Sequence, residues 1–373
     1  MNDGNYLFSI AGNIKPVDKP KFYKIAESRL NRLIKPKGSL GRLEEFAKDA
    51  VAITEKERPH LCNKFVCVFA GDHGVVEEGV SLFRQDVTVQ MVRNFLSGGA
   101  AINTIADSVG ANVIVADVGI NADMGGIEAF PSSNFINGKV GKGTFNINKG
   151  PAMTETEAVQ SLLKGIEIAK IVKEKGAEIC ATGDMGIGNT TSASAITCYY
   201  SKKAPELVCG RGTGVNTAVV KKKAEIIAKA IECNIKKNSG KTNGADKRTE
   251  AVRVLAGVGG FEIGGIAGFI LGCAINRIPV VVDGFISTAG ALIALNINPH
   301  VLDYMFAGHL SNERGHKTAV GLLGKKPVLD LSMRLGEGTG AVIAMKIIET
   351  ALNMYNNMLT FDEAGVIASK LNL

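Results

Sequence analysis

Short apolar runs alternate with helical patterns from residue 64 onward, and this alternation constrains the fold more than any other feature of the chain. The runs have the length and composition of buried strands, and they lie at 65–70, 112–118, 178–182, 279–282 and 303–307. Between them, apolar residues recur at helical spacing. Because helical crossovers connect parallel strands, we predict an α/β domain with a parallel, Rossmann-like sheet that helices cover on both faces.

The two ends of the chain depart from this alternation. Residues 22–33 and 40–54 have helical spacing, a Pro- and Gly-containing turn joins them, and Ser39 is a plausible N-cap of the second helix. A last helix is expected at about 362–371. We therefore predict two domains, a small helical domain built from 1–60 and 355–373, and a large catalytic α/β domain over 61–354.

Glycine is in excess, with 44 of 373 residues, but it has no period of three and the chain has only 10 prolines. These counts exclude a collagen-like chain and a disordered Pro/Gly tract. Glycine therefore belongs to turns and to close backbone contacts inside folded structure. Polar, glycine-rich clusters follow several predicted strands and therefore lie at the carboxyl edge of the predicted sheet. Parallel sheets bind ligands at this edge, and the helix N-termini there attract phosphate.

Charge and cysteine usage exclude several classes of protein. The net charge is +7, and the lysine runs lack interleaved aromatic residues, so we expect a solvated surface and no nucleic-acid partner. The seven cysteines are scattered without a C-x-x-C pair, which predicts buried free thiols in a reducing cytoplasm and no metal site. No secretory leader is apparent, and the apolar stretch 254–275 is predicted to be a buried helix pair and not a membrane span.

Two clusters have the composition of anion-binding loops. Residues 183–192 read GDMGIGNTTS between a strand and a helix, which favours a phosphoribosyl cradle over a plain N-capped turn. Residues 210–214 read GRGTG, and an arginine can hold a phosphate with two donors. Neither cluster has the order of a P-loop.

Three further clusters leave alternatives open. Residues 257–262, GVGGFE, match a dinucleotide fingerprint only in part. Residues 71–74, GDHG, could supply a base, a metal ligand or, as we favour, a structural or substrate-orienting histidine. Residues 334–341, RLGEGTGA, contain an acid that is either a helix-start carboxylate or a general base.

Taken together, these segments resemble one family, the nicotinate-nucleotide–dimethylbenzimidazole phosphoribosyltransferases of cobalamin assembly. The matching stretches run in family order at 35–44, 70–75, 78–81, 90–103, 183–191, 210–215, 283–285, 308–311 and 334–341. The resemblance implies transfer of the 5-phosphoribosyl group of nicotinate mononucleotide to 5,6-dimethylbenzimidazole, with nicotinate and α-ribazole 5′-phosphate as products. It also implies a homodimer that needs no cofactor.

The resemblance also assigns residues to roles. Glu337 is the general base for the benzimidazole N–H, and Asp184 is a second carboxylate where relatives often have Glu. Ser81, Phe83 and Gln85 line the base pocket, although relatives often have Tyr where Phe83 stands. The nucleotide candidates are Gly186, Gly188, Asn189, Thr190, Arg211 and Gly212. Two other classes stay open: a non-catalytic nucleotide-binding module on the same fold, and an NAD-linked oxidoreductase.

Overall fold

The computed structural model describes residues 3–125, 134–237 and 246–366. Six strands form a single sheet in the order β3-β2-β1-β4-β5-β6, and every adjacent pair is parallel. The strands are β1 (Lys64–Gly71), β2 (Ala111–Gly119), β3 (Phe135–Asn137), β4 (Ile179–Met185), β5 (Val280–Val282) and β6 (Met305–Ala307). The predicted parallel α/β fold is therefore confirmed, with one additional short edge strand, β3.

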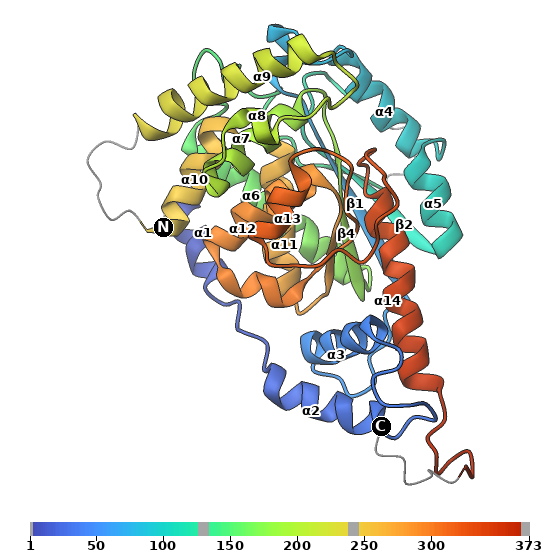
Figure 1. Cartoon of the computed structure of the whole chain (residues 1–373). Coiled ribbons are helices and arrows are strands. Elements are labelled where there is room, and N and C mark those ends of the chain that lie inside the picture. The colour runs from blue at the N-terminus through green and yellow to red at the C-terminus, as the bar shows by residue number, and fades with distance from the viewer. Residues whose placement is uncertain (1–2, 126–133, 238–245, 367–373) are drawn as a thin grey trace.

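Helices cover both faces of the sheet (Figure 1). One layer contains α6 (Glu155–Glu174), α10 (Lys247–Val258), α11 (Phe261–Ile275) and α12 (Phe285–Ile297), and α1 (Asp3–Ala11) packs against α6. The other layer contains α4 (Asp86–Leu96), α5 (Ala101–Val109) and α14 (Thr339–Asn357). Strands β2 and β3 are added on one side of β1, and strands β4, β5 and β6 are added on its other side. The direction in which strands are added therefore changes between β1 and β4, and parallel sheets bind ligands at such a point.

Further helical elements connect the strands and helices named above. They are η1 (Gly74–Glu78), α7 (Asn189–Ser201), α8 (Pro205–Val208), α9 (Thr217–Ala230), the π-helical turn η4 (Ile231–Lys236), η5 (Pro299–Tyr304) and α13 (His316–Leu322).

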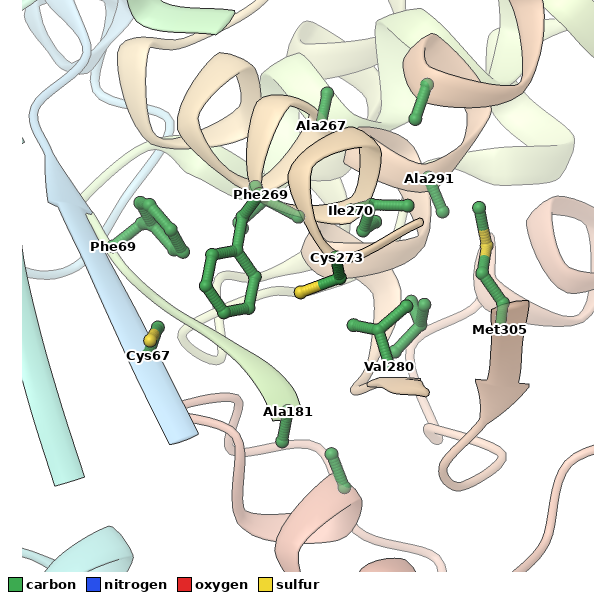
Figure 2. Packing of buried hydrophobic residues seen from close by; sticks show 14 of the residues in the cluster. Cys67, Phe69, Ala181, Ala267, Phe269, Ile270, Cys273, Val280, Ala291 and Met305 are labelled. Atoms are coloured by element: carbon green, nitrogen blue, oxygen red, sulfur yellow. The ribbon is translucent and has the colours of Figure 1, made fainter. Parts of the chain in front are cut away.

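Buried apolar side chains of α11 pack against the sheet (Figure 2). The rings of Phe69 on β1 and Phe269 on α11 meet edge to face, with centroids 5.5 Å apart. On its other side α11 lies against α6 with almost no space, because a Cβ on Gly268 would be 1.8 Å from the Leu162 carbonyl oxygen. The glycines of α11 therefore allow close helix packing. The 257–262 cluster follows from helix α10 and not from a strand, so it does not form a dinucleotide-binding loop.

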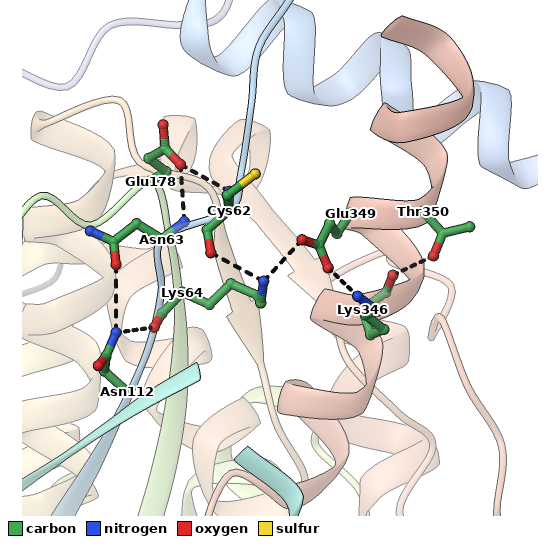
Figure 3. Close-up of polar contacts among 8 residues, drawn as sticks. All are labelled: Cys62, Asn63, Lys64, Asn112, Glu178, Lys346, Glu349 and Thr350. Atoms are coloured by element: carbon green, nitrogen blue, oxygen red, sulfur yellow. Dashed lines mark hydrogen bonds and ion pairs between the residues drawn. The ribbon is translucent and has the colours of Figure 1, made fainter. Parts of the chain in front are cut away.

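The amino edge of the sheet is held by paired charges (Figure 3). Lys64, at the start of β1, donates to Glu349 of α14 over 3.1 Å, and Lys346 donates to the same carboxylate over 2.8 Å. Nearby, Glu178 accepts the backbone N–H groups of Cys62 and Asn63.

Segments from both ends of the chain meet below the sheet (Figure 1). Helix α2 (Lys19–Leu30) packs on α3 (Arg42–Thr54), and α3 packs on α14, whose C-terminal end also receives hydrogen bonds from Arg29. The contact between terminal helices agrees with the predicted helical unit, while the domain boundaries at residues 60 and 354 stay a prediction.

Three local predictions were wrong. Helix α3 begins at Arg42 with Gly41 as N-cap and no side-chain cap, so Ser39 does not cap it. Residues 361–365 form turns, with Gly365 at φ +63°, so the helix expected at 362–371 is absent from its described part, 362–366. Residues 367–371 lie outside the described part of the chain. Strand β4 extends to Met185, so Asp184 belongs to the strand and not to the loop.

The apolar stretch 254–275 forms parts of α10 and α11, as predicted for a buried helix pair. Across the three described ranges, the structure contains no helix that combines the length and the apolar character required to cross a bilayer.

Candidate active site

The carboxyl ends of β1 and β4 and the N-terminus of α14 converge on one acidic centre. Glu337 lies in the turn before α14, between Gly336 (φ +87°) and Gly338 (φ +91°), and it has a left-handed backbone itself (φ +62°). Such a conformation is strained for a residue with a side chain. The turn is pressed against β4, since a Cβ on Gly183 would be 2.5 Å from the Glu337 carbonyl oxygen. Packing therefore holds Glu337 in place.

The Glu337 carboxylate is buried, with 5% of the residue exposed. Burial raises its pKa, the nearby charge of Asp283 raises it further, and a 3.2 Å hydrogen bond from the Ile102 backbone N–H partly opposes the change. Ile102 lies in the first turn of α5, where unpaired N–H groups favour an anion.

Asp184, the second predicted carboxylate, lies beside this turn. A Cβ on Gly336 would be 3.2 Å from both Asp184 carboxylate oxygens, and Asn189 donates to one of those oxygens over 3.0 Å. Burial raises the pKa of Asp184 well above its usual value, and the charges of Asp283, Glu262 and Glu337 act in the same direction. Among the described residues, neither Asp184 nor Glu337 has a cationic partner. Two uncompensated acids in one buried place are typical of a catalytic site.

Asp283 follows β5 and forms hydrogen bonds with the backbone at the start of α14. Its two oxygens accept the backbone N–H groups of Gly338, over 3.2 Å, and Ala341, over 2.8 Å, and His309 Nδ1 lies 3.4 Å away. The carboxylate thus caps α14. The sequence placed Asp283 in one of the family-matching stretches, 283–285, but did not predict this contact.

The predicted nucleotide residues lie on the adjoining loop and helix. A Cβ on Gly186 would be 2.1 Å from the Gly71 carbonyl oxygen, and Gly188 has φ +100° with Val76 close by, so both positions require glycine. Asn189 and Thr190 begin α7, and Gly212 approaches the Thr190 hydroxyl. The structure brings these residues together.

A lysine that we had not singled out completes this cluster. Lys223 of α9 is 1% exposed, and its ammonium donates to the Thr190 hydroxyl over 3.1 Å. Burial lowers its pKa, although Cys209 and Glu313 oppose the change. The lysines at 221–223 are predicted to lie on the solvated surface, and this prediction is wrong for Lys223. Its helical phase was the available signal, since Lys223 shares a face with the buried Ile227 and Ala230.

Arg211 is on the same loop as Gly212, but its side chain is exposed and makes none of the side-chain hydrogen bonds or ion pairs found among the described residues. Its guanidinium is therefore not brought into the cluster, whereas Arg334 reaches the Gly212 carbonyl oxygen at 3.5 Å.

The predicted base-pocket residues lie on a segment that contacts the 210–214 loop and the end of β1. The Thr213 hydroxyl is 3.4 Å from the Ser81 hydroxyl and accepts the Leu82 N–H over 3.2 Å, so this loop contacts the 210–214 loop. Gln85 donates to the His73 carbonyl oxygen over 2.9 Å, and Phe83 is 51% exposed.

Comparisons with known proteins identify the family of the chain. A family model described as phosphoribosyltransferase matches residues 14–366. The nicotinate-nucleotide–dimethylbenzimidazole phosphoribosyltransferase of Geobacter metallireducens is 52% identical over 96% of this chain and 98% of its own length, and that of Geotalea uraniireducens is 49% identical over 97% and 98%. The crystal structure of the enzyme of that name from Thermus thermophilus superposes with a TM-score of 0.84 at 42% identity, covering 93% of this chain and 99% of that one.

The fold and the match to the family model thus define a phosphoribosyltransferase. More narrowly, the chain belongs to the nicotinate-nucleotide–dimethylbenzimidazole phosphoribosyltransferase family, as its sequence motifs predicted.

Proposed function

We propose that this protein transfers the 5-phosphoribosyl group of nicotinate mononucleotide to 5,6-dimethylbenzimidazole or a related base. The products are nicotinate and α-ribazole 5′-phosphate, the nucleotide used in cobalamin assembly. The observation that carries the proposal is Glu337, a buried acid without a cationic partner among the described residues, at the switch point of the sheet in a chain half identical to enzymes of that name.

Glu337 suits the role of general base. The pyridinium ring of the mononucleotide carries a positive charge, so nicotinate can leave with a neutral ring and needs no acid. A benzimidazole ring nitrogen forms the new bond to C1′ as the bond to nicotinate breaks, and the N–H proton of the base passes to Glu337. The raised pKa makes Glu337 a stronger base than an exposed carboxylate. Attack from the face opposite nicotinate gives the α product.

We assign the phosphate to the loop 186–190 and Lys223. The backbone there approaches a ligand without Cβ obstruction, and the positive dipole end of the thirteen-residue α7 favours an anion. Lys223 is a buried cation whose ion pair with a phosphate would offset its burial. Asn189, Thr190 and Gly212 complete the nucleotide side, and Arg211 stays a candidate that must move inward to take part.

We assign the base to the wall formed by Ser81, Phe83 and Gln85, with Asp184 as the second carboxylate next to Glu337. The aromatic face of Phe83 offers stacking area, and Ser81 and Gln85 offer hydrogen-bonding groups. Asp184 shares its hydrogen-bond partner Asn189 with the nucleotide side, so it connects the two halves of the site.

We further propose a homodimer located in the cytoplasm. Leu82, Phe83 and Leu335 are each more than half exposed on the loops around the site, and such clustered apolar side chains favour a protein interface. All seven cysteines are free thiols, in keeping with a reducing compartment. Light scattering of the purified protein checks the dimer.

The activity is tested by incubating the protein with nicotinate mononucleotide and a panel of benzimidazoles, purines and phenols, and identifying ribotide products by mass spectrometry. We expect base-dependent formation of α-ribazole 5′-phosphate. Mononucleotide binding without turnover on any base would instead support a non-catalytic binding module on the same fold.

A further inference from the structure

A buried chain of three polar side chains lies beneath the site and outside the roles assigned above. The His73 imidazole lies between Glu262, whose Oε1 is 2.7 Å from Nε2, and Ser192, whose hydroxyl is 3.0 Å from Nδ1. All three residues are at most 1% exposed. Whichever ring nitrogen carries the proton, both nitrogens have a partner.

Each member belongs to a different part of the site. Ser192 is in the first turns of α7, three residues after Asn189. Glu262 is in the first turn of α11, where the helix end favours a carboxylate. His73 follows β1, and its carbonyl oxygen accepts the amide N–H of Gln85 on the base side.

The backbone of Gly260 and that of Gly188 pack closely against His73. A Cβ on Gly260 would be 2.3 Å from His73 Cε1, and a Cβ on Gly188 would be 3.0 Å from His73 Cβ. The imidazole therefore connects α7 to α11 through its two ring nitrogens, while the backbone carbonyl oxygen of the same residue bonds Gln85. Burial strengthens the hydrogen bonds at the two ring nitrogens, while the second carboxylate oxygen of Glu262, Oε2, is buried without a hydrogen-bond partner among the described residues.

We propose that Ser192–His73–Glu262 is a positioning chain for the transfer reaction, which sets the separation between the nucleotide on α7 and the base held by the Gln85 loop. The proposal rests on the residue roles proposed above. Because the reacting atoms must be held at attack distance, loosening this chain should lower kcat more than it weakens substrate binding.

The test uses Ser192→Ala, which removes only the hydroxyl bonded to His73. The matched control is Thr197→Val, which removes a buried hydroxyl from the same helix, where it donates to the Ala193 carbonyl oxygen. Loss of one hydrogen bond should lower the kcat of Ser192→Ala by roughly 5- to 10-fold, with KM for nicotinate mononucleotide changed by less than about twofold. The kcat of Thr197→Val should match wild type.

Wild-type kcat in Ser192→Ala, an equal fall in Thr197→Val, or a change confined to KM would each overturn the positioning role. Failure of the wild-type protein to turn over would instead count against the proposed function, so the two failures are distinguishable.

A double-mutant cycle sharpens the test. Gln85→Met removes the amide that bonds His73 from the base side. If His73 links the two sides, Ser192→Ala should lower kcat less in the Gln85→Met protein than in wild type. Fully multiplicative effects would contradict a chain that runs through His73.

Discussion

Two glutamates associated with α14 have opposite electrostatic environments. Glu349, in the C-terminal half of the helix, accepts from Lys64 and Lys346 at the amino edge of the sheet (Figure 3). Burial alone would raise its pKa, but the two lysines outweigh burial and hold the pKa below its usual value. Glu337, just before the helix, has no cationic partner among the described residues, and its pKa is raised.

The opposite pKa shifts of the two glutamates distinguish the amino edge of the sheet from its carboxyl edge. At the amino edge, the partly buried carboxylate of Glu349 is paired with two lysines and stabilises the fold. At the carboxyl edge, Glu337 and Asp184 are buried without a cation from the described residues, which disfavours their charged forms and costs stability at neutral pH. Such an arrangement persists where the unpaired charge serves a reaction.

The largest expected effect comes from Glu337→Gln. Removing the general base should lower kcat/KM by about 10²- to 10⁴-fold, while the free energy of unfolding stays the same or rises because a neutral amide is easier to bury. Steady-state kinetics and urea unfolding measure the two quantities. Full turnover by this variant would remove Glu337 from the role of base.

The next effect concerns the buried lysine. Lys223→Met should raise KM for nicotinate mononucleotide by roughly 10- to 100-fold, because a charge-assisted hydrogen bond to phosphate is lost. Lys221→Met, two residues earlier on the exposed face of α9, is the control and should leave KM unchanged. Equal KM values in the two variants would contradict a phosphate site at Lys223.

The pH dependence follows from the raised pKa of Glu337. Only the ionised carboxylate can accept the proton, so kcat/KM should fall about tenfold per pH unit below that pKa, which lies above the ordinary value of 4.5. The folded state binds this proton more tightly than the unfolded state, so the contribution of Glu337 to stability improves as pH falls through the raised pKa. A pH–rate profile without an acidic limb above pH 4.5 would be inconsistent with this assignment.

The smallest effect is expected at the other end of α14. Glu349→Gln leaves the buried Lys64 ammonium without its carboxylate and should reduce the free energy of unfolding by about 2 kcal/mol. Because Glu349 lies at the amino edge, kcat/KM should not change. A loss of activity in the folded variant would show that the two edges are not separable in this way.

Much of the fold was predictable because it rests on local patterns. The alternation of strands and helices indicated the parallel sheet, and the glycine-rich clusters indicated the edge where ligands bind. The short edge strand β3 was not predicted, because three residues carry too little pattern. The helix expected at 362–371 is contradicted over its described part, because helical spacing does not reveal the turns at 361–365.

The candidate site was only partly predictable for a different reason. Glu337, Asp184 and the glycine loops stand in motifs that are contiguous in the sequence. Lys223 meets Thr190, and Glu262 meets His73, only after the chain has folded, since 189 positions separate the latter pair. No local pattern encodes such contacts, although the helical phase of Lys223 indicated its burial.

The central claim is that this site transfers a phosphoribosyl group to an aromatic base. It is tested most directly by following nicotinate release from nicotinate mononucleotide with and without 5,6-dimethylbenzimidazole. We expect release only when the base is present, with one α-ribazole 5′-phosphate formed for each nicotinate. Nicotinate release at the same rate without the base, or no release with it, would contradict the account.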